Sequence, residues 1–130
     1  MSMSAVKTDA EFIHVYTRAQ AIADGVLVDV SALAREAGFK VPVAMTAAAW
    51  ADCVAWPPEA GGQDETGRLW DVLYLAGWQA RGHPTHNLVG FGVLRVRPPE
   101  TQPSYAELQL HIGPGDQGEP VATIMLVGED

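Results

Sequence analysis

Two histidines three residues apart, His83 and His86 in the stretch GHPTH, have the spacing of a metal-binding pair. Imidazole nitrogens are preferred zinc ligands, but a catalytic zinc site needs at least one further protein ligand. Asp71 and the acidic residues near the C-terminus are the candidates, and none has a diagnostic spacing. The alternative is that both histidines cap the end of a helix, where they suit the negative end of its dipole. We expect the capping role and no cofactor.

Nucleophilic side chains are few and poorly placed for catalysis. The single cysteine, Cys53, lies among apolar neighbours in AAAWADCVAW without an adjacent histidine or cation, so we expect an inert, buried thiol. The serines lack the GxSxG setting of a catalytic elbow. A general acid–base pair among the sixteen carboxylates stays open, because any two could meet in the fold. The sequence therefore favours a protein that is not an enzyme, although catalytic activity stays open.

The loop GPGDQGEP, between Gly113 and Pro120, is the most motif-like stretch of the chain. A phosphate-binding loop leads into a helix and supplies a lysine, whereas here the strand-like segment VATIMLV follows and no lysine is present. An EF-hand needs more oxygen ligands than Asp116, Gln117 and Glu119 provide. Glycine, proline and aspartate in this order favour a wide hairpin turn.

The first half of the chain predicts short elements with recognisable caps. Threonines precede two helices, and the first, Thr17, has a glutamine three residues later, which forms a capping box. Glycines that can adopt a left-handed conformation close the first two helices. The expected helices are 17–24, capped by Thr17 and closed by Gly25; 32–37, capped by Ser31 and closed by Gly38; and 47–56, capped by Thr46. The expected strands are Phe12–Tyr16 and Val26–Val30, with Lys40–Met45 at an edge or outside the sheet because of Pro42.

The longest predicted helix runs from Asp64 to Arg81 and carries two apolar stripes. Acidic residues begin it and an arginine ends it, as the helix dipole prefers. One stripe contains Leu69, Val72, Leu73 and Ala76. The other contains Trp70, Tyr74 and Trp78, spaced by four. A helix that is apolar over so much of its circumference is either central to the fold or shared with a partner.

The last third of the chain predicts three strands, Leu88–Val96, Ser104–Ile112 and Val121–Val127. The middle strand alternates apolar and polar residues, which indicates one buried and one wet face. Arg95 and Arg97 share a parity that would place them opposite Glu107 and Tyr105 in a hairpin. We expect a single α+β domain over residues 1–130, with helices packed on one face of an antiparallel sheet. Its core would be the C-terminal three-stranded meander, with Val26–Val30 as a candidate edge strand.

The charge balance limits the classes of partner. Eight basic against sixteen acidic residues give a net charge of −8, which disfavours direct binding to nucleic acid. No apolar run approaches the roughly 20 residues that span a bilayer. The N-terminal residues lack the pattern of a signal peptide. We therefore expect a cytoplasmic protein with no membrane association.

Four tryptophans, at positions 50, 56, 70 and 78, lie in the two predicted helices that flank the proline-rich loop 57–63. Tryptophan is enriched at the energetic centres of protein interfaces, but it also fills cores. We expect most of the four in the core and one or two exposed. The candidate interaction residues are Trp56, Trp70, Tyr74 and Trp78.

Three segments, VYTRAQAIADGVLVDVSALAREAGFKVPVAMTAAAWADCV, GRLWDVLYLAGWQAR and GPGDQGEPVATIMLVGED, together resemble a known family. It consists of small uncharacterised proteins carried on bacterial plasmids, phages and other mobile elements, and it is defined by a domain of unknown function. The resemblance covers nearly the whole chain and implies a bacterial cytoplasm and an accessory role for a mobile element. It implies no activity, cofactor or site residues.

These observations favour a non-enzymatic interaction module that binds a protein partner or a second copy of itself. One alternative is an acidic DNA mimic that inhibits a host restriction or defence enzyme, which would need most carboxylates on one face. The other is a small metal-dependent hydrolase using His83 and His86, which would need a third ligand beside a concave pocket.

Overall fold

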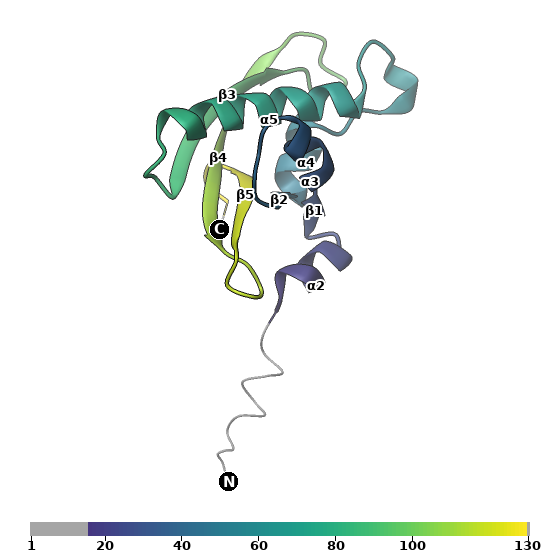
Figure 1. Ribbon diagram of the computed structural model, residues 1–130. Coiled ribbons are helices and arrows are strands. Elements are labelled where there is room, and N and C mark those ends of the chain that lie inside the picture. The colour runs from purple at the N-terminus through teal and green to yellow at the C-terminus, as the bar shows by residue number, and fades with distance from the viewer. Residues whose placement is uncertain (1–15, 130) are drawn as a thin grey trace.

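The computed structural model describes residues 16–129 (Figure 1). The helices are α2 (Arg18–Ala23), α3 (Ser31–Glu36), α4 (Ala47–Cys53) and α5 (Glu65–Gly82), with a short 3-10 helix η1 (Pro58–Ala60). The strands are β1 (Leu27–Asp29), β2 (Val43–Thr46), β3 (Leu88–Arg95), β4 (Ser104–Pro114) and β5 (Pro120–Leu126). The α+β class is as expected. The strand predicted at Phe12–Tyr16 falls outside the described residues except for Tyr16, which precedes α2.

All five strands form one sheet in the order β1-β2-β5-β4-β3. The sheet is mixed rather than antiparallel, because β2 runs parallel to β5 while the other neighbours are antiparallel. β1 forms one edge, as expected for VLVDV, and β3 forms the other. The placement of Lys40–Met45 at an edge or outside the sheet is wrong, since β2 is an interior strand. Pro42 lacks only an N–H, and its carbonyl still accepts the Ala122 N–H at 2.9 Å.

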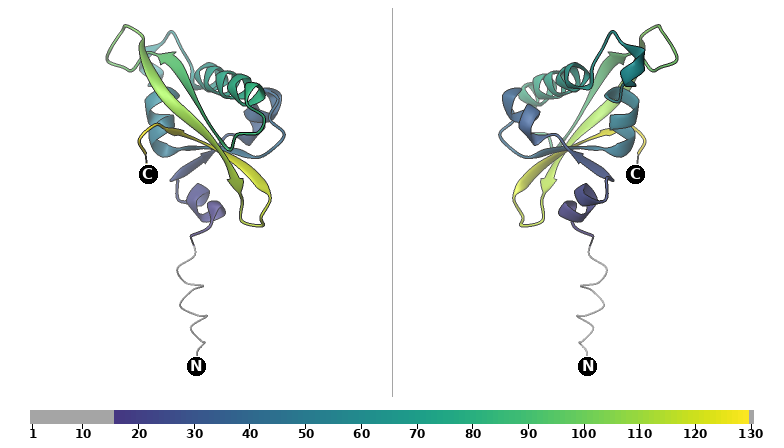
Figure 2. Two further views of the ribbon diagram at one scale, coloured as in Figure 1. Left: turned by 90° about the vertical axis from the view of Figure 1, so that its left-hand side faces the viewer. Right: turned by 90° about the vertical axis from the view of Figure 1, so that its right-hand side faces the viewer.

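The helices lie on both faces of the twisted sheet (Figure 2). Buried residues of α3, α4 and α5 share one core with alternate residues of the strands, among them Met45, Leu108, Leu110 and Ile124. α2 lies on the opposite face, because its Arg18 guanidinium donates to the Thr123 hydroxyl, and Thr123 points away from that core. The expectation of helices on one face therefore does not hold for α2.

Side-chain caps begin α2, α4 and α5, but not α3. The Thr17–Gln20 capping box is present, and the hydroxyl of Thr46 accepts the Ala49 N–H at the start of α4. The prediction for Ser31 is wrong, since it is the first residue of α3 and makes no cap. Its hydroxyl instead accepts the Val43 N–H at 3.0 Å, so it ties α3 to β2. Gly25 and Gly38 have φ of 80° and 105°, as closing glycines require.

The glycine-rich loop is the hairpin turn between β4 and β5, as predicted, with Pro114 paired to Pro120. Its Asp116 has a second role, because the carboxylate accepts the N–H groups of Arg18 and Ala19 at 2.8 and 3.0 Å. These two backbone hydrogen bonds hold the pKa of Asp116 below its ordinary value. The hairpin therefore anchors the first turn of α2.

The β3–β4 hairpin has a different register from the predicted one. Glu107 lies opposite Gly92, Tyr105 opposite Leu94, and Arg95 opposite Ser104. Arg95 shares its parity with the inward-facing Val93, so it cannot share the wet face with Glu107. The predicted alternation in β4 is confirmed, since Ala106, Leu108 and Leu110 are buried and their neighbours are not.

Candidate interaction surface

The two stripes of α5 have different environments. The first stripe is buried in the core, with Leu73 and Ala76 at 0% exposure. The second stripe faces outward, with Trp70, Tyr74 and Trp78 exposed by 38%, 49% and 62%. Residues four apart on a helix are neighbours, so the three rings form a continuous aromatic surface along α5. We call these three residues the aromatic stripe.

The tryptophans differ in how far they are exposed. Trp70 and Trp78 are exposed, while Trp50 is partly buried and packs against the core. Tyr74 and the two indoles each carry a hydrogen-bond donor on this exposed side of α5. Tyrosine and tryptophan usually hydrogen-bond through that donor when they are buried. A partner that covers the stripe can therefore accept hydrogen bonds from these side chains.

Trp56 does not join the stripe. Its indole Nε1–H donates to the Gly61 carbonyl at 3.1 Å, and its ring lies 4.8 Å from the guanidinium carbon of Arg68. Its backbone N–H donates to Glu65 at 3.1 Å. These contacts hold the proline-rich loop against the start of α5, so Trp56 has an internal role in this structure.

A small basic groove adjoins the stripe. A cavity of about 270 Å³ lies between α5 and the segment after α3. Arg81, one turn from Trp78, lines it together with Phe39 and Lys40. Gly77 forms its floor, because a Cβ there would lie 3.3 Å from the Arg81 guanidinium and 3.5 Å from the Phe39 ring. Arg81 therefore places a cation one turn from the end of the aromatic stripe, and Lys40 lines the same groove.

The two histidines lie at the end of α5, with ring centroids 5.2 Å apart. His83 is the C-cap residue, and its Nδ1 lies 3.0 Å from the Gln79 carbonyl, which matches the expected capping role. His86 follows in the next turn, where its N–H donates to the His83 carbonyl. Within residues 16–129 no group of three or more His, Cys, Asp or Glu side chains is placed to hold a metal ion.

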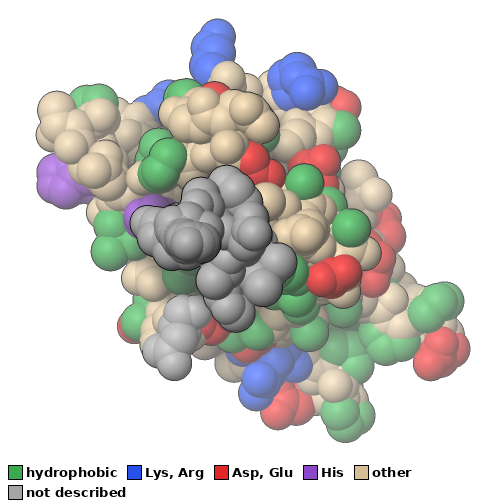
Figure 3. Space-filling model, turned by 90° about the horizontal axis from the view of Figure 1, so that it is seen from below, with side chains coloured by type: hydrophobic (Ala, Val, Ile, Leu, Met, Phe, Trp, Pro, Cys, Tyr) green, Lys and Arg blue, Asp and Glu red, His purple; other side chains and the backbone are tan. Residues whose placement is uncertain are grey.

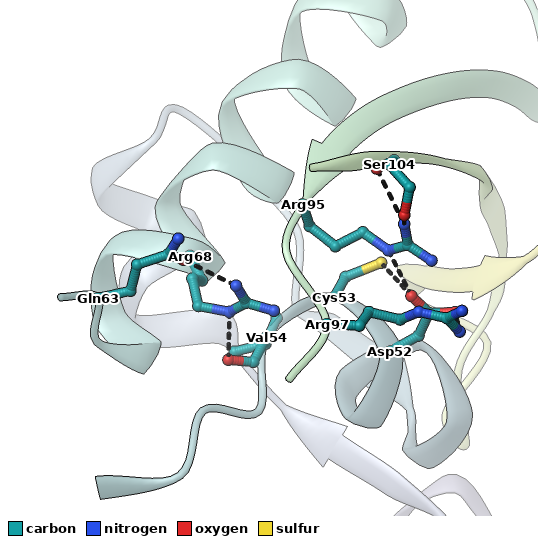
Figure 4. Close-up of polar contacts among 8 residues, drawn as sticks. All are labelled: Asp52, Cys53, Val54, Gln63, Arg68, Arg95, Arg97 and Ser104. Atoms are coloured by element: carbon teal, nitrogen blue, oxygen red, sulfur yellow. Dashed lines mark hydrogen bonds and ion pairs between the residues drawn. The ribbon is translucent and has the colours of Figure 1, made fainter. Parts of the chain in front are cut away.

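A buried charge cluster joins α4 to the end of β3 (Figure 4). The Arg95 Nε–H donates to Asp52 at 2.6 Å, and its Nη1 donates to the Ser104 carbonyl and hydroxyl at 2.9 and 2.7 Å. Arg97 lies 3.8 Å from the same carboxylate, rather than opposite Tyr105. Burial disfavours the charge on Arg95, but the hydrogen bond and charge of Asp52 outweigh it, so the pKa of Arg95 is raised.

The charge cluster was not predicted, although the sequence contains a signal for it. Arg95 continues the inward parity of Val89, Phe91 and Val93, which predicts a buried arginine that needs an anionic partner. Asp52 could not be chosen from sixteen carboxylates without the fold.

Arg68 is a second buried cation near this cluster. Its Nε–H donates to the Val54 carbonyl at 3.0 Å and its Nη1 to Gln63 at 2.7 Å, while Nη2 has no partner among the described residues. It lines a cavity of about 740 Å³ around the first turns of α5, as does Arg95. Both cations are already engaged with protein groups, so they link elements of the fold.

Cys53 is buried beside Asp52, as expected for an inert thiol. Burial, together with the neighbouring carboxylate, raises its pKa to about 12.

The thiolate is the reactive form, so alkylation of the native protein at pH 8 is expected to proceed only through unfolding. Mass spectrometry after iodoacetamide treatment should show an unmodified native protein and full modification in denaturant. Rapid modification without denaturant would contradict this prediction.

The visible face in Figure 3 bears on the DNA-mimic hypothesis. Its acidic side chains are interspersed with hydrophobic, polar and basic groups. A mimic would need carboxylates in a dense row, so this face offers no support for one.

Among the described helices, none is both long and apolar enough to cross a membrane.

A family model described as "Family of unknown function (DUF6573)" matches residues 3–130. No curated protein and no solved structure matches the chain. The match covers nearly all of the sequence, including every described helix and strand. The chain therefore belongs to the DUF6573 family, whose function is unknown.

Proposed function

We propose that this protein is a non-enzymatic interaction module that binds a protein partner through the aromatic stripe of α5. The observation that carries the proposal is the exposure of Trp70, Tyr74 and Trp78 on one side of an 18-residue helix. Tryptophan and tyrosine are enriched among the few residues that contribute most of the binding energy of protein interfaces.

The helix itself suits this role. Its opposite side is fixed in the core by Leu69, Val72 and Leu73, so the stripe is presented on a rigid support. A rigid surface loses little conformational entropy when a partner covers it. Aromatic side chains add to this advantage, because each has only two side-chain torsions to fix.

The basic groove indicates the chemistry of the partner. Arg81 lies one turn from Trp78 and shares the groove with Lys40, so an apolar segment that also carries a carboxylate would complement this end of the stripe. The resemblance to proteins of mobile elements supports an accessory role in a bacterial host, with a host protein as the first partner to seek.

The proposal is tested by affinity capture from a host lysate with three forms of the tagged full chain. These are the unmodified protein, Tyr74→Ser/Trp78→Ser, and Val26→Ser/Val127→Ser, which removes two other exposed apolar side chains. We expect a partner that the first and third forms recover and the second does not.

Circular dichroism establishes that all three forms are folded. Equal recovery of every protein by the stripe variant and the unmodified chain would overturn the proposal. Loss of a protein in both variants alike would indicate general adhesion to apolar surface, and would also count against a specific site.

A further inference from the structure

β3 is an edge strand with unusual properties. It contains eight residues, and its first seven, Leu88–Leu94, carry no charge and no proline. Within residues 16–129 it has a neighbour on one side only, which is β4. We propose that this edge pairs with β3 of a second copy of the chain, giving a two-fold dimer with a continuous ten-stranded sheet.

The sequence of the strand indicates a second copy as the occupant. The seven residues Leu-Val-Gly-Phe-Gly-Val-Leu, 88–94, read the same in both directions about Phe91. Antiparallel pairing around a two-fold axis at Phe91 therefore places every residue opposite one of the same type. Leu88 meets Leu94 of the second copy, and Gly90 meets Gly92.

Backbone geometry supports the same register. The Ile112 N–H donates to the Asn87 carbonyl, so residues 87, 89, 91 and 93 make the hydrogen-bonded pairs with β4. The N–H and C=O groups of Leu88, Gly90, Gly92 and Leu94 consequently point to the free edge. Pairing about Phe91 brings these same four residues opposite one another, so all their outward groups become bonded.

The exposed side chains match this arrangement. Leu88 and Leu94 are 51% and 66% exposed on the face opposite α5, at the two ends of the palindrome. In the dimer each lies in a cross-strand pair with the other, which covers both. The two central glycines have no side chains on this face. The Tyr105 ring of the same chain covers Gly92, since a Cβ on Gly92 would collide with that ring.

The other edge strand of the sheet, β1, is protected against pairing with another chain. β1 is only three residues long and includes the charged Asp29. Short length and charge are common devices against edge-to-edge association. β3 has neither over Leu88–Leu94, and because this stretch is uncharged, two copies with a net charge of −8 can meet there without local repulsion.

The mass of the full chain in solution tests the proposal. Sedimentation equilibrium over a concentration series should give a dimer, with twice the 13.9 kDa chain mass. A wild-type protein that remains monomeric throughout would overturn the proposal, whether or not another protein's strand can occupy the edge.

Charge patterns at the two leucines test the register. Leu88→Lys/Leu94→Lys places like charges opposite each other, and we expect dimerisation at least about 10-fold weaker, even though the net negative charge falls. Leu88→Glu/Leu94→Lys places opposite charges in both pairs, and we expect it to stay dimeric. Val26→Lys, at a site of 52% exposure away from β3, is the matched control and should behave as wild type. Equal effects of the two double variants would overturn the pairing.

A covalent test does not depend on the strength of association. Leu88→Cys/Leu94→Cys should form disulfide-linked dimers on mild oxidation, because paired residues bring their Cα atoms about 5.5 Å apart. Leu88→Cys alone should not, since that pairing keeps the two copies of residue 88 apart. Cys53 is buried and does not compete. Equal cross-linking of the single and double variants would overturn the register.

Discussion

Replacing Asp52 by alanine is expected to lower the free energy of unfolding by about 3 kcal/mol. Arg95 is nearly enclosed, with its side chain 7% exposed, and Asp52 is its charge partner at 2.6 Å. Removing the carboxylate leaves a buried guanidinium bonded only to Ser104, and an uncompensated buried charge costs more than the ion pair contributes. Urea unfolding at a fixed protein concentration measures the change.

Two further variants separate the buried charge from a general packing defect. Asp52→Ala/Arg95→Met removes both charges, and its unfolding free energy should recover to within about 1 kcal/mol of wild type. Arg97→Ala should cost less than about 1 kcal/mol, because that side chain is half exposed and 3.8 Å from the carboxylate. An Asp52→Ala cost no larger than that of Arg97→Ala would contradict the buried-charge account.

Leu73→Ala is expected to lower the free energy of unfolding by about 3 kcal/mol, whereas Tyr74→Ala should cost less than about 1 kcal/mol. The two residues are adjacent on α5, but Leu73 has 0% exposure and Tyr74 has 49%. Truncating the first leaves a cavity in the core, while truncating the second removes a side chain in contact with water. The comparison tests whether α5 has one structural side and one free side.

Both values come from urea unfolding at matched protein concentration, because dimerisation would make the apparent stability depend on concentration. A large loss for Tyr74→Ala would show that the stripe stabilises the fold itself, and would remove the main support for a binding surface there.

Local patterns predicted the parts of the fold that depend on neighbouring residues. The Thr17–Gln20 box, the long α5 and the β4–β5 turn each follow from a few residues whose side chains or glycines act within one turn of chain. The buried stripe of α5 also follows from spacing alone, because a helix that packs on a sheet needs one apolar side.

The failures concern long-range choices. The parallel pairing of β2 with β5 joins residues about eighty positions apart, and no local feature of Val43–Thr46 distinguishes an interior strand from an edge. For Arg95, counting along the hairpin predicts a position opposite Glu107, whereas the connection between β3 and β4 sets a different register. The loop sequence predicts only a turn role for Asp116, because its hydrogen bonds to Arg18 and Ala19 join residues about a hundred positions apart.

The exposure of the candidate interaction residues follows only partly from their spacing. Trp70, Tyr74 and Trp78 lie together on an exposed side of α5, whereas Trp56 packs against Arg68, a cation–ring contact that spacing does not predict. Whether a stripe faces the core or water depends on which side of the helix meets the sheet. The sequence left two stripes of similar apolar character, so the fold had to decide between them.

The most direct test of the binding surface is calorimetric titration of the captured partner with wild type and Trp78→Ala. A central interface tryptophan contributes about 2 kcal/mol or more, so the account predicts at least about 30-fold weaker binding. It also predicts an unchanged free energy of unfolding, because Trp78 is 62% exposed. Unchanged affinity, or weaker binding accompanied by an equal loss of stability, would contradict the account.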